Sequence, residues 1–308
     1  MKPIVILGVF VADTAYRADR QPRMGETILG HDFKLGPGGK GSNQAVAVGR
    51  LAAPVHFITR TGDDAFAAMA EETWKKAGVT PSVTRTPTSY TGAAYIFIEQ
   101  ATGNNAIIVS PGAARLLTPA DLDERAALIG AASIFMTQLE QPLDAATRGL
   151  EIARAAGVTT ILNSAPGADL PDSMIALCDY LTPNESEAEA LTGIAVTGPE
   201  DGRQAAEQLI ARGAGSVIVT LGEKGALLVS KAGAVHVPAV SAGKVLDTTG
   251  AGDAFNGGFA VALARGLPPE DAVRFGCCVA GISVTRPGTA PAMPDLAEAE
   301  ALFGRKLA

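Results

Sequence analysis

Short apolar runs alternate with amphipathic stretches along most of this 308-residue chain. The runs "IVILGVFV" at 4–11 and "VHFIT" at 55–59 predict strands, as do "ASIFMT", "VTTILN", "YLTPN" and "SVIVTLG" further along. Helical patterns lie at 42–53, 63–78 and 142–157, between these runs. Strands that alternate with helices form a parallel sheet with helices on both faces. The pattern therefore predicts an α/β fold, a three-layer α/β/α sandwich around a mostly parallel sheet.

Two segments interrupt the alternation. Residues 23–35 and 92–110 look extended, and the second has the form of a hairpin that turns near "TGNN". We expect a small β-sheet lid from segments near 12–35 and 92–110, the alternative being an edge extension of the main sheet. The C-terminal part is helical, at 251–265, 269–285 and 295–303, and no linker or repeat divides the chain. Residues 1–308 are therefore expected to form a single domain.

The composition narrows the classes of partner. Acidic residues outnumber basic ones, 32 to 25, and no basic cluster is present, which argues against nucleic acid. Cys178, Cys277 and Cys278 contain no C-x-x-C spacing, so a disulfide framework and a zinc site are not expected and a reducing compartment is. The first apolar run stops at Asp13, and no run approaches the roughly 20 residues that cross a bilayer. We expect a cytoplasmic protein without a membrane segment.

The stretch "DTTGAGDAFNGG" at 247–258 places a carboxylate behind two glycines at the start of a helix. Backbone N–H groups at a helix start have no partner within the helix and attract anions, and glycine lets a phosphate come close. Asp253 beside such a site suits the acceptance of a proton from a hydroxyl that attacks phosphorus. A helix start with an acidic residue in its first turn explains the same letters, and this stretch alone does not decide between the two.

A second glycine-rich stretch, "GPGGKGSNQAVA" at 36–47, contains a G-x-G-x-x-G match. It follows an expected lid strand, and no acidic residue closes the next strand, so a dinucleotide site is a weak interpretation. Lys40 is followed by Gly41, which departs from a P-loop. We expect a tight loop that aims Lys40 and Asn43 at a polyhydroxylated substrate, the alternative being a plain turn with a solvated lysine.

Two further stretches have both a functional and a purely structural interpretation. In "TPNESEAEALTG", Asn184 and Glu187 lie three residues apart on a helix start, where they could orient Mg²⁺ and phosphates or simply form a capping box. Taken locally, the capping box is favoured. "VTLGEKGALL" at 219–228 predicts a hairpin, whose turn could also provide backbone contacts to a nucleotide.

Together and in order, these motifs resemble the ribokinase branch of the PfkB carbohydrate kinases. The resemblance runs from "VILGVFVAD" through "GETILG", "GGKGSNQAVA", "TGDDAF", "QLEQPL", "TPNESEAEALTG", "VTLGEKG" and "DTTGAGDAFNGG" to "VTRPGTAP". It implies transfer of the γ-phosphate of ATP to the primary (5-) hydroxyl of a pentose, D-ribose first. It also implies a homodimer clasped through the lids.

The resemblance assigns roles by motif match. Asp253 is implied as the catalytic base, with an anion hole at Gly250, Ala251 and Gly252. The residues implied to bind the sugar are Val11, Asp13, Gly39, Lys40, Gly41, Asn43 and Glu140. Those implied to bind ATP are Asn184, Thr220, Gly222, Gly225, Gly252 and Cys277, with Glu187 serving Mg²⁺ and the phosphates. A K⁺ site is implied at Asp247, Thr249, Ser283, Arg286, Gly288 and Ala292, several of them through backbone carbonyls.

One position departs from the ribokinase pattern. The first strand of ribokinases ends Asn-x-Asp, whereas this chain has Val11, Ala12 and Asp13. A valine cannot hydrogen-bond a hydroxyl, and deoxyribokinases are similar in carrying an apolar residue there. The alternative substrates are therefore 2-deoxy-D-ribose or another sugar or nucleoside of the family. From other classes, a catalytically silent sugar-binding regulator and a dehydrogenase remain as alternatives.

Overall fold

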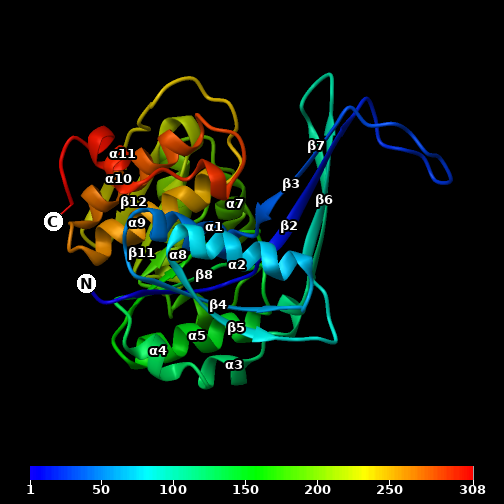
Figure 1. Cartoon of the computed structure of the whole chain (residues 1–308). Helices are drawn as coiled ribbons and strands as arrows, with labels where there is room; N and C mark the ends of the chain where they lie inside the picture. The colour runs from blue at the N-terminus through cyan, green and yellow to red at the C-terminus, as the bar shows by residue number, and fades with distance from the viewer. Residues whose placement is uncertain (308) are drawn as a thin grey trace.

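The computed structural model describes residues 1–307 and contains two β-sheets (Figure 1). The larger sheet has nine strands, in the order β13-β12-β11-β10-β9-β8-β1-β4-β5. The strands from β11 to β5 in that order are parallel, and β12 and β13 complete one edge in antiparallel pairing. Their bounds are β1 (Ile4–Leu7), β4 (Val55–Thr61), β5 (Val79–Arg85), β8 (Ile134–Thr137), β9 (Thr159–Leu162), β10 (Tyr180–Leu181), β11 (Ser216–Thr220), β12 (Ala226–Ser230) and β13 (Gly233–Val237).

Helices cover both faces of this sheet, because its central strands are apolar on both sides. In β1, Ile4 and Ile6 belong to one buried cluster and Val5 and Leu7 to another. The first cluster includes α1 (Lys40–Arg50), α2 (Ala65–Ala77), α9 (Ala251–Ala264), α10 (Pro269–Ser283) and α11 (Leu296–Phe303). The second includes α3 (Pro119–Asp123), α4 (Ala126–Gly130), α5 (Leu143–Ala155), α6 (Asp172–Ile175), α7 (Glu185–Thr192) and α8 (Pro199–Ala211). The predicted three-layer sandwich is confirmed.

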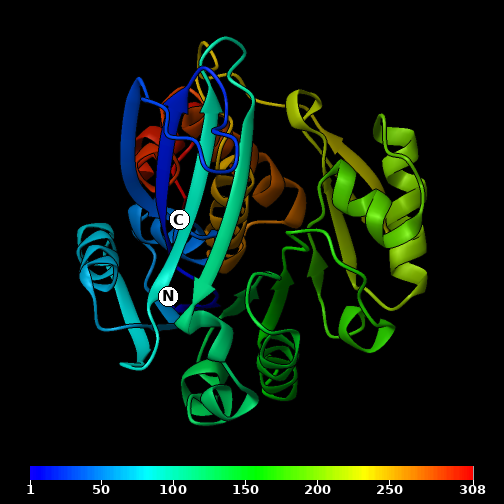
Figure 2. The ribbon, with the colours of Figure 1, turned by 90° about the vertical axis from the view of Figure 1, so that its right-hand side faces the viewer.

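The smaller sheet projects from the main body (Figures 1 and 2). Its order is β3-β2-β6-β7, with β2 (Val11–Ala18), β3 (Asp32–Gly38), β6 (Thr91–Glu99) and β7 (Asn105–Gly112). Strands β6 and β7 form an antiparallel hairpin, and β2 pairs with β3 antiparallel and with β6 parallel. It is thus a separate sheet and not an extension of the main one.

The expected single strand over 4–11 is wrong, because the chain changes sheets within it. β1 ends at Leu7, and β2 starts at Val11 in the smaller sheet. A Cβ on Gly8 would lie 2.7 Å from the Cα of Gly41, so the start of α1 packs directly against the chain at this point. Val9 and Val11 stay buried in a small cluster of their own, which is why the apolar run continues across the change. The expected helix at 42–53 likewise begins earlier, at Lys40.

A hydrogen-bonded joint connects the smaller sheet to α2. Asp64 caps this helix by accepting from the N–H of Ala67 at 2.9 Å, and its other carboxylate oxygen accepts from the N–H of Thr91 at 2.7 Å. The Thr91 hydroxyl accepts in turn from the N–H of Gly62 at 3.0 Å. One carboxylate therefore fixes both a helix start and the first residue of β6.

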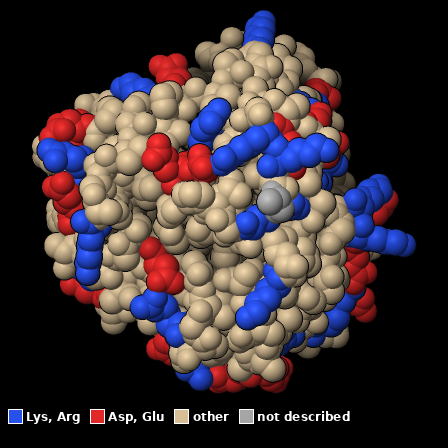
Figure 3. All heavy atoms as spheres, turned by 90° about the vertical axis from the view of Figure 1, so that its left-hand side faces the viewer, with Lys and Arg blue, Asp and Glu red and all other residues tan. Residues whose placement is uncertain are grey.

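Charged side chains on one face of the molecule are mixed in sign, with Lys and Arg interspersed among Asp and Glu (Figure 3). Opposite charges pair repeatedly along the helices, as between Arg203 and Glu200 at 2.8 Å. In residues 1–307, no helix combines the length and the apolar character needed to cross a membrane.

Candidate active site

Polar residues occur where four neighbouring strands of the main sheet end. Gln138 follows β8, Asn163 follows β9, Thr182 follows β10 and Thr220 closes β11. Ligands of open α/β sheets bind outside these carboxyl ends. A cavity of about 150 Å³ lies here, lined by Lys40, Asn163, Ala165, Thr182, Asn184, Glu187, Thr220, Thr248, Gly250, Ala251, Gly252, Asp253 and Asn256.

Asp253 is a buried carboxylate of the cavity. It lies in the first turn of α9 and is 6% exposed. Its Oδ2 accepts from the amide of Asn43 at 3.0 Å, and its Oδ1 accepts from the amide of Gln44 at 3.1 Å. Burial raises the pKa of Asp253, against the charge of Lys40 and the two amides, which lower it. A carboxylate with a raised pKa suits general base chemistry near neutral pH.

The start of α9 leaves backbone donors free for an anion. Gly250 is the N-cap residue, with φ of 77° in the left-handed region that favours glycine. Within residues 1–307, no hydrogen bond is found for the N–H of Gly250 or Gly252, while that of Ala251 donates to Thr248 at 3.2 Å. A Cβ on Gly252 would meet nothing within 4 Å. Gly252 therefore leaves open space at the helix start, where the backbone attracts negative charge.

The start of α1 brings Lys40 into the cavity. Its N-cap Gly39 has φ of 88°, and a Cβ there would lie 2.5 Å from the carbonyl oxygen of Val9. Lys40 follows as the first helical residue, and its backbone N–H donates to Glu140 at 2.8 Å. Burial raises the pKa of Glu140 to about 7, although Lys40 opposes the shift. The glycine turn thus places an ammonium and a carboxylate beside Asp253.

Asp13 adds a third carboxylate. Burial, with the charge of Asp253, raises the pKa of Asp13 to about 6. In the described part of the chain, its carboxylate has no hydrogen bond or ion pair, and it lies against Gly38, where a Cβ would come within 2.2 Å of Oδ2. Val11 lies on the same side of β2, 4% exposed and clustered with Ala94. A free carboxylate beside an apolar side chain suits a ligand with hydroxyls on one part and none on another.

Asn184 and Glu187 line the cavity and also form the capping box that the sequence favoured. The N–H of Glu187 donates to the Asn184 side chain at 2.8 Å, and the N–H of Asn184 donates to Glu187 at 3.0 Å. Burial raises the pKa of Glu187. Among residues 1–307, no group of three or more His, Cys, Asp or Glu could hold a metal by itself. Mg²⁺ is often held by one carboxylate together with substrate phosphates, a role that fits Glu187.

Three predicted nucleotide residues lie outside the cavity lining. Gly222 and Gly225 belong to the turn between β11 and β12, where a Cβ on Gly225 would come within 2.1 Å of the carbonyl oxygen of Val237. Cys277 is 6% exposed within the core cluster of α10, and burial raises the pKa of its thiol to about 12. Their contact with a nucleotide stays a prediction.

The predicted cation residues lie on two segments that meet beside Gly250, one at 247–249 and one from the end of α10 to Ala292. Asp247 accepts from the N–H of Gly288 and from that of Thr249, both at 2.9 Å. Burial alone would raise the pKa of Asp247, but these hydrogen bonds outweigh it and lower the pKa, so the carboxylate stays charged. Ser283 ends α10, Ala292 ends the following short turn, and the Arg286 side chain pairs with Glu298.

Sequence reasoning missed several polar residues of the site, namely Gln44, Gln138, Asn163, Thr182 and Asn256. The Gln44 amide donates to Asn163 at 3.1 Å as well as to Asp253, and Gln138 donates to Gln44. Asn163 continues the network to the carbonyl of Thr182. A polar residue directly after a buried strand is the signal that could have found three of these five.

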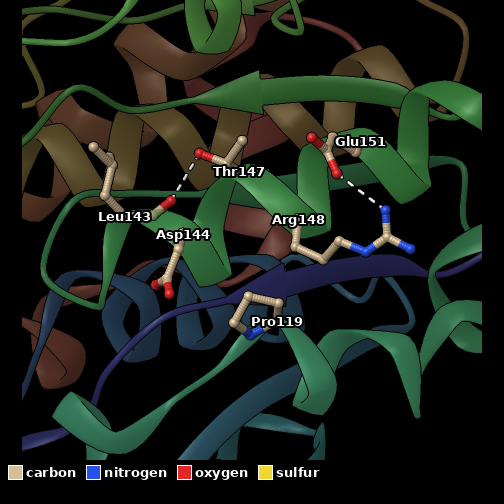
Figure 4. Close-up of a pocket in the computed structure, with 6 residues that line it drawn as sticks. All are labelled: Pro119, Leu143, Asp144, Thr147, Arg148 and Glu151. Carbon is tan, nitrogen blue, oxygen red and sulfur yellow. Dashed lines mark hydrogen bonds and ion pairs between the residues drawn. The ribbon is translucent and has the colours of Figure 1, made fainter.

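A second hollow, of about 550 Å³, opens between α5 and the start of α3 (Figure 4). Its hydroxyl and guanidinium groups already have partners. The Thr147 hydroxyl donates to the carbonyl of Leu143, and Arg148 pairs with Glu151 at 3.0 Å and with Asp123 at 2.7 Å. These pairings leave the hollow without the convergent free polar groups of the first cavity.

Comparison with known proteins agrees with this geometry. Residues 1–296 match the pfkB family of carbohydrate kinases. The chain is 37% identical to the deoxyribokinase of Salmonella typhi over 295 residues, 95% of this chain and 96% of that one. It is 35% identical to the ribokinase of Haemophilus influenzae over 298 residues, covering 96% and 97%. Its fold matches Arabidopsis thaliana ribokinase complexed with ribose and ATP, with a TM-score of 0.94, 31% identity and 98% of both chains covered. The predicted resemblance and fold are confirmed.

Proposed function

The chain belongs to the pfkB family of carbohydrate kinases, as a ribokinase-like kinase, and we propose that it transfers the γ-phosphoryl group of ATP to the primary 5-hydroxyl of D-ribose. The observation that carries the proposal is that buried Asp253 lies on the same first turn of α9 as the N–H groups of Gly250 and Gly252, which have no hydrogen bond within residues 1–307. This arrangement sets a proton acceptor beside an anion site, which phosphoryl transfer to an alcohol requires.

The chain's own groups then have defined roles in the reaction. Asp253 takes the proton of the sugar hydroxyl as that oxygen forms a bond to the γ-phosphorus. The bond from this phosphorus to its bridging oxygen breaks, and ADP leaves. The N–H groups at the start of α9, together with Lys40, stabilise the charge on the transferred group. Asp13, Glu140 and Asn43 hold the other sugar hydroxyls, with Gly39 and Gly41 letting the sugar approach.

A second substrate, 2-deoxy-D-ribose, is favoured by Val11. This side chain is 4% exposed among Val9, Ala94 and Ala114, all apolar. A sugar hydroxyl turned towards this cluster would lose its hydrogen bonds to water without replacement, whereas a methylene would not. The sequence relatives include both a deoxyribokinase and ribokinases at similar identity, so overall identity does not choose between the two sugars, and we infer the choice from this position.

The nucleotide and its ions are assigned to the other end of the cavity. ATP is proposed to lie along Asn184 and Thr220, with Mg²⁺ held by its phosphates and by Glu187. A monovalent cation, K⁺, is proposed beside Asp247, because this carboxylate stays charged and K⁺ in proteins binds to oxygen atoms. The ion would supply positive charge beside the loop that carries Gly250.

The smaller sheet is proposed to act as the lid and to pair with a second copy of the chain. One of its faces carries Tyr16, Phe33, Leu35 and Ile108, which are 42%, 51%, 46% and 66% exposed. An apolar face of this kind marks an interaction surface. Mass measurement by light scattering tests the pairing, and Ile108→Glu should give a monomer if it is correct.

The activity test is ADP release with Mg²⁺ and K⁺ present, against D-ribose and 2-deoxy-D-ribose side by side. We expect turnover of at least one sugar, and loss of about 100-fold or more in Asp253→Asn while sugar binding by calorimetry persists. Faster turnover of 2-deoxy-D-ribose would replace ribose by the second candidate. Silence on both sugars, or full activity of Asp253→Asn, would reject the proposal.

A further inference from the structure

Asp253 is turned away from the helix end that its position would let it cap. An acidic residue at the third position of a helix commonly folds back to the N–H of the N-cap residue. Here the carboxylate instead accepts from Asn43 and Gln44 on α1. The N–H of the N-cap residue, Gly250, consequently keeps no protein partner among residues 1–307. The two amides thus separate the proton acceptor from the anion site.

The amide of Gln44 can have only one orientation. A carboxylate accepts hydrogen bonds and donates none when ionised, so Gln44 must turn its NH₂ group to Asp253. That group also donates to Asn163 at 3.1 Å, which uses both of its hydrogens. The carbonyl oxygen of Gln44 then faces Gln138, whose NH₂ group donates to it. The charge on Asp253 therefore fixes the orientation of two side chains in turn, Gln44 and then Gln138, both fully buried.

This fixed orientation leaves one polar atom unsatisfied, at Gln138. The side-chain carbonyl oxygen of Gln138 is buried and has no hydrogen-bond partner among residues 1–307. It lies against Gly8 and Gly41, where a Cβ would come within 2.5 Å and 2.8 Å of it. Rotating the side-chain amide of Gln138 by half a turn would not help, because its carbonyl oxygen would then face the carbonyl oxygen of Gln44. An unsatisfied buried group needs an explanation, and the fixed direction of the network supplies one.

We propose that Gln44, held in orientation by Gln138, is a positioning residue that keeps the Asp253 carboxylate off the start of α9 and turned towards the sugar hydroxyl. The proposal rests on the proposed role of Asp253 as base. It assigns to Gln44 no contact with the substrate. Its action is to hold the ionised form of Asp253 in one place and to leave the open lone pairs of that carboxylate on the cavity side.

The charges that face Asp253 come from four other elements. Lys40 on α1 is the cation, and Asp13 on β2, Glu140 after β8 and Glu187 on α7 are acidic. All of them remain in a Gln44 variant. Removing an amide that donates to the ionised carboxylate raises the pKa of Asp253, so the acid limb of the kcat profile should move to higher pH.

The test compares Gln44→Met, Gln138→Met and Gln141→Met. We expect Gln44→Met to lower kcat about tenfold to hundredfold, with KM for ATP within about threefold and the acid limb raised by about one pH unit. Gln138→Met, which does not touch Asp253, should shift both quantities less in the same direction. Gln141→Met is the matched control, because this buried glutamine donates to Thr137 and to the Gln138 backbone but not to Asp253.

The possible results distinguish a positioning role of Gln44 from a purely structural one. An unmoved acid limb in Gln44→Met, or an equal shift in Gln141→Met, overturns the proposal. If Gln44→Met does not fold, Gln138→Met decides by the same readout. If the wild type phosphorylates no sugar, the proposed function fails. The hydrogen bond between Gln44 and Asp253 can still be tested, by a double-mutant cycle between Gln44→Met and Asp253→Asn measured by urea unfolding. Coupling that is absent at every pH would reject the contact.

Discussion

The carboxylate of Asp13 should make the folded protein less stable at neutral pH than an uncharged side chain at the same place. It has no hydrogen-bond partner in residues 1–307, and burial, with the charge of Asp253, raises its pKa from 3.8 to about 6. An acid with a higher pKa in the folded state binds more protons when folded. The free energy of unfolding then falls as pH rises through this interval.

The shift sets the size of the effect. A rise from 3.8 to about 6 corresponds to about 3 kcal/mol above pH 7 and about 1 kcal/mol at pH 4.5. Asp13→Asn keeps the shape of the side chain beside Gly38 and removes its charge. We therefore expect this variant to gain up to about 3 kcal/mol in the free energy of unfolding at pH 8, or about 4 °C in Tm for a chain of this length. Sugar affinity should fall about tenfold or more, because an acceptor for hydroxyls is weakened.

The assay is urea unfolding at pH 8 and pH 4.5, followed by the fluorescence of Trp74, the single and fully buried tryptophan. Asp169→Asn, at an exposed loop position, is the control and should change stability at neither pH. The reasoning is refuted if Asp13→Asn is no more stable than the wild type at pH 8, or if it gains equally at both values. Either result would mean that burial does not penalise this carboxylate.

Three further changes test other parts of the site. Gly252→Ala should fold with equal or greater stability, by up to about 1 kcal/mol, yet lose phosphoryl transfer, because its methyl group enters the anion site. Gly202→Ala in α8, which does not line the cavity, should keep full activity in the same ADP-release assay. Val11→Asn should raise the ratio of kcat/KM for ribose to that for 2-deoxyribose about tenfold or more; an unchanged ratio would exclude Val11 as a specificity residue. Asp64→Ala should cost about 1–2 kcal/mol in urea unfolding and also raise KM for the sugar, whereas Asp295→Ala, which removes the cap of α11 only, should affect stability alone.

The layered fold could be read from the sequence because each signal is local. Strands buried on both faces are continuous apolar runs, and the helices between them begin and end at recognisable residues, such as Asp64 and Gly78 around α2. The change of sheet at Gly8 could not be read in this way. Hydrophobicity records that Val9 and Val11 are buried, but it does not record which sheet buries them.

The site, like the fold, contains residues that a local sequence signal predicts and contacts that no local signal predicts. Lys40, Asn184, Glu187 and Asp253 were predicted because each sits at a helix start, where glycine or a cap marks the chain locally. Contacts across the chain were not predicted. The capping-box interpretation of Asn184 and Glu187 and the functional one are compatible, since the box turns both residues to the cavity. The same local motif is thus consistent with a capping role and a functional role, and only the fold shows that the two are compatible.

Gln44 shows where a sequence rule could have gone further. It lies on α1 in a run of buried residues that continues through Ala45, Val46, Ala47 and Val48, so an apolar residue would be expected at this position. A buried glutamine there loses its hydrogen bonds to water and must find partners from other elements. Such a conflict between local pattern and residue type is expected at functional sites. The conflict points to Gln44, and only the three-dimensional contact with Asp253, 209 positions away, says what the glutamine does.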